Sequence, residues 1–179
     1  DQALKVVDVV VQERPFCMQA RAQRGAILGL MGKEAEGLKA LPFRSGKAGI
    51  EEWQQQYVQG LLLLKLKRHE ESRRQLVDRL AETVVSRDSE AMLRLGSALS
   101  FLTYNKADEA LCEVEQIQGV VNGYRQYIVD TLRLHIATLK KDKDLRTHLL
   151  NKLQGARRRY PLIEKVVDAI ERDDLQEAV

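Results

Sequence analysis

Cysteine, which cross-links small disulfide-bonded folds, and proline, which interrupts helices, are both scarce in this sequence. Only two cysteines and three prolines occur among the 179 residues, and aromatic side chains make up 5%. Cys17 and Cys112 are far apart and fit no CxxC or other metal-ligand spacing, which argues against a disulfide framework and a zinc site. We therefore expect two reduced, buried thiols and a cytoplasmic or similarly reducing environment.

Long apolar runs, strand patterns and a large excess of one charge are also missing. The run Leu61–Leu64 is bounded by Gln59 and Lys65, so no segment approaches the roughly 18 residues of a membrane helix. No stretch alternates with period two for the length of a strand. The 29 basic and 26 acidic residues interleave to a net charge of +3, which is too small to imply nucleic acid.

Motifs of catalysis and cofactor binding are absent as well. His69, His135 and His148 share no HExxH spacing, and no GxSxG or GxGxxG occurs. The pair Gly46-Lys47 lacks the rest of a phosphate-binding loop. We expect no chemistry in this chain, and neither a metal nor a cofactor.

What the sequence does contain is helical periodicity along its whole length. Apolar residues at helical spacing predict ten helices, at about 1–14, 16–31, from 33, 50–66, 69–85, 88–103, 107–119, 124–141, 144–159 and from 162. Pro15 closes the first, Asp88 and Asp144 are predicted N-caps, and Asn105 is predicted to lie in a turn.

Small residues open several of these helices at a regular interval. The residues are spaced 34, 35 and 38 positions apart: Ala3, Gly37, Ser72 and Ala110. A second small residue precedes three of them by twelve positions: Gly25, Gly60 and Ala98. An aliphatic residue follows each by four positions: Val7, Leu41, Leu76 and Val114. Missing side chains on both helices of a pair allow a close antiparallel approach, so the spacing predicts repeated helix hairpins.

The segments 25–38, 57–72 and 99–111 resemble tetratricopeptide repeats, whose signature places two small residues twelve apart and a proline twelve further on. The resemblance implies an all-α, right-handed solenoid of antiparallel helix-turn-helix repeats. We expect the second helix of a truncated repeat at 1–15, repeats at 16–49, 50–86 and 88–121, a degenerate repeat at 123–161 and a capping helix at 162–179. In the degenerate repeat, Ala137 would pair with the large Leu149. The truncated first repeat predicts a fragment of a longer protein.

The resemblance also implies that the first helix of each pair lines a concave groove. The groove positions are almost wholly apolar: Ala22, Ala26, Leu30, Tyr57, Leu61, Leu64, Leu95, Leu99 and Leu102. Chaperone-binding members of the family place lysine, asparagine and arginine there instead. An apolar groove favours an amphipathic helix or extended peptide as the ligand.

The sequence leaves open how the apolar surfaces of three helices are buried. Leucines 61–64 occupy about 300° of helix circumference, so either the curvature of the solenoid or a loop buries them, or a partner covers them. The last helix either caps the final repeat or fills the groove. The valine-rich first helix is covered by further sequence of a longer protein or by a second copy of the chain.

The sequence thus predicts a non-catalytic scaffold or adaptor for another protein, without a membrane segment. The alternative is a ligand- or peptide-sensing regulatory arm of a larger regulator. A closed, polar pocket would favour the sensor, and an open apolar groove the adaptor. The run Arg157, Arg158 and Arg159 spreads over about 200° of a helix end and forms no basic stripe, so nucleic-acid binding is not favoured.

Overall fold

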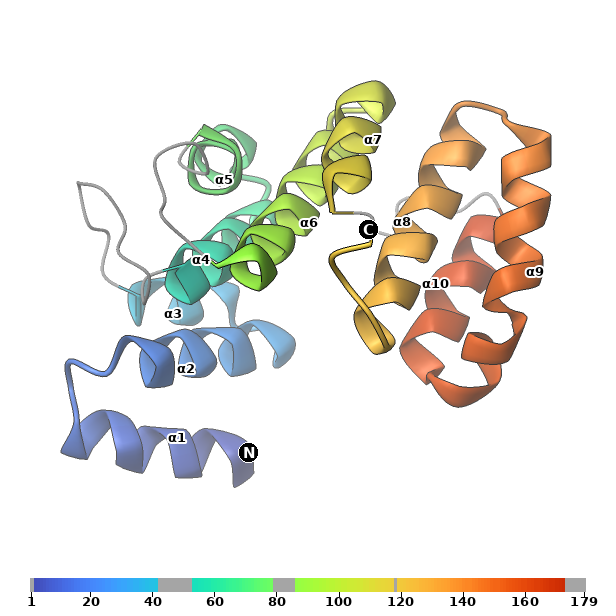
Figure 1. The fold of residues 1–179 in the computed structure, drawn as a ribbon. Helices are drawn as coiled ribbons and strands as arrows, with labels where there is room; N and C mark the ends of the chain where they lie inside the picture. The colour runs from blue at the N-terminus through green and yellow to red at the C-terminus, as the bar shows by residue number, and fades with distance from the viewer. Residues whose placement is uncertain (1, 42–52, 79–85, 118, 173–179) are drawn as a thin grey trace. The chain divides into compact units, whose positions relative to one another are not determined.

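The computed structural model describes residues 2–41, 53–78, 86–117 and 119–172, and every regular element in these ranges is a helix (Figure 1). The helices are α1 (Gln2–Glu13), α2 (Met18–Leu30), α3 (Glu34–Lys39), α4 (Trp53–Lys65), α5 (His69–Leu76), α6 (Arg87–Thr103), α7 (Ala107–Gln116), α8 (Tyr124–Leu139), α9 (Lys143–Arg159) and α10 (Pro161–Glu171). The prediction of an all-helical chain with ten helices is confirmed for this part of the chain.

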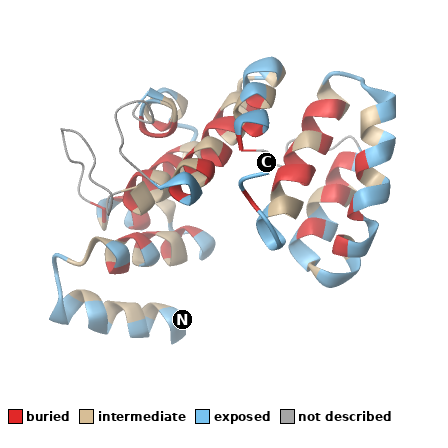
Figure 2. Cartoon of the chain, in the orientation of Figure 1, coloured by how far each residue is buried: buried red, intermediate tan, exposed pale blue. Residues whose placement is uncertain are grey.

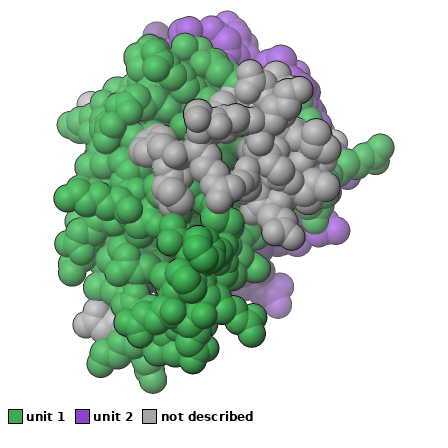
Figure 3. Space-filling model, turned by 90° about the vertical axis from the view of Figure 1, so that its left-hand side faces the viewer, with its two compact units in different colours: residues 1–96 green, residues 97–179 purple. Residues whose placement is uncertain are grey.

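The chain divides into two compact units, Asp1–Gly96 and Ser97–Val179, which Figure 3 draws in different colours. In the first unit α1 packs on α2, α2 on α3 and α4, and α4 on α3 and α5. Leu38, Leu41, Leu62 and Leu63 form a buried cluster among α3, α4 and the residues that follow α3. Each contact joins helices that are one or two places apart in sequence, as expected for stacked hairpins.

The second unit has its own core. Here α8 contacts α7, α9 and α10, and α9 also contacts α10. The buried side chains of this core come from three helices: Leu134, Leu149, Leu153, Ala156, Ile163, Val167 and Ile170. The predicted capping helix is α10, and its apolar face closes this three-helix cluster.

The paired small residues mark close helix contacts in the first two hairpins, as the sequence predicts, whereas Ala3 on α1 is exposed. A Cβ atom on Gly37 would lie 2.8 Å from the carbonyl oxygen of Gly25, which is closer than carbon atoms tolerate. In the next hairpin the hydroxyl of Ser72 donates to the Gly60 carbonyl at 2.9 Å. Ala98 and Ala110, the third pair, are both fully buried. In the first two hairpins the backbones approach closely because little or no side chain separates them.

The aliphatic residues fill the space beside the first small residue of a pair. A Cβ atom on Gly25 would meet Leu41 at 2.9 Å, and one on Gly60 would overlap three carbons of Leu76. Both spacings are sixteen residues, and the same spacing separates Ala98 from Val114, which are each fully buried. The knob and its small-residue hole therefore recur from one hairpin to the next.

Four hairpins turn with the same backbone geometry. The residues with positive φ are Gly32 (76°), Lys67 (58°), Asn105 (58°) and Lys141 (57°), spaced 35, 38 and 36 positions apart. In each turn this residue donates its N–H to the carbonyl three positions back, and the next residue donates to the carbonyl five positions back. This is the Schellman motif, which satisfies the last carbonyls of the helix. It includes the turn of the hairpin whose sequence repeat is degenerate.

Two predicted N-caps are wrong by two residues. At α6 the hydroxyl of Ser86 accepts from the Ser89 N–H at 3.3 Å, and Asp88 lies within the first turn. At α9 the carboxylate of Asp142 accepts from the Leu145 N–H at 3.0 Å, so Asp144 is inside the helix. The cap must stand three residues before the N–H that it accepts from. The helix predicted at 69–85 ends at Leu76, and its part from 79 to 85 lies outside the described residues.

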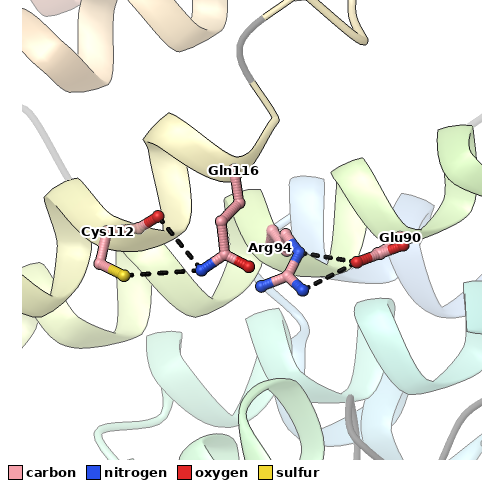
Figure 4. Close-up of polar contacts among 4 residues, drawn as sticks. All are labelled: Glu90, Arg94, Cys112 and Gln116. Carbon is pink, nitrogen blue, oxygen red and sulfur yellow. Dashed lines mark hydrogen bonds and ion pairs between the residues drawn. The ribbon is translucent and has the colours of Figure 1, made fainter.

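The expectation of two buried thiols is also wrong. Both cysteines are free, but Cys17 is half-buried and Cys112 is exposed. Cys112 lies midway between the buried Ala110 and Val114 on α7, which places it on the opposite side of the helix. Gln116 lies one turn further on, and its amide nitrogen is 3.5 Å from the Cys112 sulfur (Figure 4).

Candidate functional site

The predicted groove positions divide into three groups by burial. Ala22, Leu95 and Leu102 are buried among neighbouring helices, so they contribute to the core and leave no surface for a ligand. Ala26, Tyr57, Leu61, Leu64 and Leu99 are half-buried. Leu30, at the end of α2, is 85% exposed. In the first unit, α2 and α4 thus carry the accessible members of the set, while Leu99 and Leu102 belong to the second unit.

The four leucines of α4 have two different environments. Leu62 and Leu63 are in the core, where Leu62 approaches both Gly29 of α2 and Gly37 of α3. Leu61 and Leu64 lie on the other side of the helix and are half-buried. Neighbouring helices therefore cover half of the run, and Leu61 and Leu64 keep accessible apolar surface.

Tyr57 sits against α6 within the first unit. A Cβ atom on Gly96 would lie 3.1 Å from the Tyr57 ring, which places the ring against the α6 backbone. Burial raises the pKa of the Tyr57 phenol to about 12, because the phenolate would lose its hydration there. Tyr57 is thus a neutral, mainly apolar wall residue at ordinary pH.

On α6 itself, the side away from the core is polar. Arg94 is ion-paired with Glu90 one turn earlier, at 2.8 Å (Figure 4). Leu95, the next residue and a predicted groove position, points into the core and is 2% exposed. Because Arg94 is paired with Glu90 of the same helix, the polar side of α6 does not present a row of unpaired basic residues.

Sequence reasoning missed three buried glutamines on α4. Gln55, Gln56 and Gln59 are almost inaccessible to solvent. The Gln56 amide donates to the Gln75 carbonyl at 2.6 Å, and the Gln59 amide donates to the Leu41 carbonyl at 3.3 Å. Both carbonyls lie at or just beyond the C-terminal ends of α3 and α5, where helix geometry provides no partner. Gln56 and Gln59 therefore supply hydrogen bonds to carbonyl groups at the ends of α5 and α3.

Helix α1 is apolar on two faces but contains no buried residue (Figure 2). Leu4, Val7 and Val11 are half-buried on the side that packs against α2. On the other side Val6 is 62% exposed and Val9 is 52% exposed, with Val10 beside them. Large aliphatic side chains at helical spacing on a solvent-facing side are typical of an interaction surface.

A polar cleft lies in the first unit, bordered by α1, α2 and the end of α3. Its volume is about 410 Å³, and its polar lining is Asp8, Gln12, Arg21, Arg24 and Lys39. Arg24 Nε donates to Asp8 Oδ1 at 2.6 Å. Arg21 Nε is buried without a hydrogen-bond partner among the described residues. No motif marks these residues, because they converge from three helices and their spacing in sequence carries no pattern.

In the second unit several ion pairs join neighbouring helices. Asp130 is fully buried on α8 and is 2.8 Å from the ammonium of Lys152 on α9. Arg157 contacts both Asp168 and Glu171 of α10. The first arginine of the basic run therefore joins two helices, and Arg158 and Arg159 are exposed at the helix end. Burial lowers the pKa of His135 on α8, which favours its neutral form.

The described part of the chain lacks two kinds of feature. No helix there is both long enough and apolar enough to cross a membrane. Within the same ranges, no three histidine, cysteine or carboxylate side chains come together to hold a metal ion.

No known protein family, curated protein or solved structure matches this chain. The resemblance to tetratricopeptide repeats therefore stays a prediction.

Proposed function

We propose that the chain is a non-catalytic scaffold that binds another protein through apolar helix faces, within a right-handed solenoid of tetratricopeptide-like hairpins. The repeated small-residue contacts and the four equal turns support this organisation. Repeated hairpins of this kind stack so that each unit buries its neighbour and the array presents an extended surface. We place it in a reducing, cytoplasmic environment, in keeping with its two free cysteines.

The observation that carries the proposal is the exposure of Leu30. It is 85% exposed at the C-terminal end of α2, on the same face as Ala26. An isolated exposed leucine is ordinary, but α4 adds Leu61 and Leu64, which are partly accessible, and α2 contacts α4 directly. Apolar anchors on adjacent helices suit an amphipathic helix or extended peptide, the partner class that the apolar positions predict.

Peptide selection tests the proposal. Helical peptides would be selected for binding to the wild-type chain and then measured by calorimetry against Leu30→Asp. We expect at least about tenfold weaker binding, because a charge would replace an apolar anchor, a loss of about 1.4 kcal/mol or more.

Leu162→Asp is the matched control, because Leu162 is also exposed, at 61%, but lies on α10 in the second unit. It should bind the selected peptides as the wild type does. Circular dichroism would check that both variants stay folded. Equal affinity of wild type and Leu30→Asp would contradict the proposed surface.

A further inference from the structure

The polar cleft of the first unit carries more positive charge than its own residues neutralise. Arg21, Arg24 and Lys39 face one carboxylate, that of Asp8. The ion pair between Arg24 and Asp8 uses that carboxylate at 2.6 Å. Among the described residues, Arg21 and Lys39 take part in no ion pair, so the described lining combines three cations with one carboxylate.

Arg21 supplies the second observation. Its Nε is shielded from solvent and lacks a hydrogen-bond partner in the described part of the chain. An arginine side chain stays protonated at all ordinary pH values, so this N–H remains a donor. A buried donor without an acceptor is unfavourable, and more so when the group is charged. An acceptor oxygen entering the cleft would remove that cost.

The residues that line the cleft determine which class of ligand can bind there. Guanidinium groups present parallel N–H donors that match the two oxygens of a carboxylate or phosphate, and an ammonium adds a point charge. About 410 Å³ is enough for a small molecule and lies within the usual range of ligand sites. Val11 and Ala40 also line the cleft, so the charged groups determine which ligand binds and the apolar wall adds only contact area.

We propose that this cleft binds a small ligand that carries two negative charges on oxygen atoms, a phosphate or a dicarboxylate, between Arg21 and Lys39. The site is distinct from the proposed peptide surface. At 100° per residue, Arg21 and Arg24 project about 170° away from the mean direction of Ala22, Ala26 and Leu30 on α2. Ligand binding in the cleft and peptide binding at Leu30 therefore succeed or fail independently.

Calorimetry and thermal unfolding of the full chain test the site with inorganic phosphate and with succinate, at an ionic strength held constant with chloride. We expect one of the two to bind saturably and to raise the unfolding temperature. Arg21→Gln and Lys39→Gln should each weaken this binding by at least about tenfold, since each removes a charged contact. The anion that binds distinguishes a phosphoryl ligand from a dicarboxylate.

Arg74→Gln provides the matched control, because Arg74 is an exposed arginine on α5 of the same unit and lies outside the cleft. It loses the same charge and should bind the anion as the wild type does. Having both Arg21→Gln and Lys39→Gln keeps the test valid if one variant fails to fold. The site is refuted if neither anion acts beyond chloride, or if the folded cleft variants respond like Arg74→Gln.

Discussion

At the scale of single residues, two glycines in helix interiors have opposite roles. Gly60 faces Leu76, and a methyl group there would overlap the leucine side chain. Gly155 lies within α9 and has open space where a Cβ atom would be added. The same residue type is required at one position for packing and is dispensable at the other.

Alanine substitution should separate these roles. Gly60→Ala should lower the free energy of unfolding by about 1–3 kcal/mol, since Leu76 would have to leave its site. Gly155→Ala should raise it by about 0.5–1 kcal/mol, since alanine is the better helix former and meets nothing. Urea unfolding followed by circular dichroism gives both values. If Gly60→Ala were as stable as Gly155→Ala, the proposed close contact of α4 and α5 would be wrong.

At the scale of helices and turns, the turn residues show how little of the backbone geometry is visible in the sequence. Only one of the four positive-φ positions of the Schellman turns is a glycine; the others are Lys67, Asn105 and Lys141. A lysine with positive φ costs roughly 1–2 kcal/mol, which the paired carbonyls and the packing of the hairpin offset.

Glycine substitution at such a turn should be stabilising. We expect Lys141→Gly to raise the free energy of unfolding by up to about 1 kcal/mol, the relief of strain less the entropy of an unfolded glycine. Lys165→Gly is the control, because Lys165 is an exposed lysine inside α10 of the same unit. The free energy of unfolding of Lys165→Gly should fall by about 1 kcal/mol. If thermal unfolding showed a lower free energy of unfolding in both variants, the positive φ at Lys141 would be wrong.

The sequence predicts helices and their pairing better than surfaces. Periodicity and the spacing of Gly25, Gly37 and Gly60 are local signals, and the helices and close contacts that they predict are present. The caps failed because Asp142 and Asp144 are chemically equal candidates, and only backbone geometry selects between them. The burial of Leu95 and the cleft at Arg21 depend on which helices meet, which no single segment encodes.

At the scale of the whole molecule, the two units have different titrating groups in their interiors. In the first unit burial raises the pKa of Tyr57 to about 12, from an unfolded value near 10. In the second unit burial lowers the pKa of His135 below its ordinary value. The stabilising contribution of Tyr57 is complete below about pH 10 and is lost as the pH rises towards 12. That of His135 is complete above its unfolded pKa near 6.5 and is lost as the pH falls through the folded value.

Alkali should therefore weaken the first unit, and acid the second. Fluorescence of Trp53, the sole tryptophan, reports on the first unit, and circular dichroism reports on both. Between pH 10 and 12, the free energy of unfolding of the wild type should fall by up to about 3 kcal/mol more than that of Tyr57→Phe. Below pH 6.5, His135→Gln should show a flatter pH dependence than the wild type.

Exposed residues of the same types serve as controls in this experiment. Tyr124→Phe and His148→Gln remove the same side-chain groups at exposed positions of the second unit, so neither should reproduce the change seen with Tyr57→Phe or His135→Gln. If Tyr57→Phe loses stability in alkali as steeply as Tyr124→Phe, the burial of the Tyr57 phenol is refuted.

The short turns within the four hairpins also bear on how quickly the chain reaches its native state. Within each unit the helix contacts join helices that are one or two places apart, so the loops that must close during folding are small. Closing small loops loses little chain entropy, and such topologies have low contact order. Either end of a unit can therefore start folding, and a slow search for distant partners is not required.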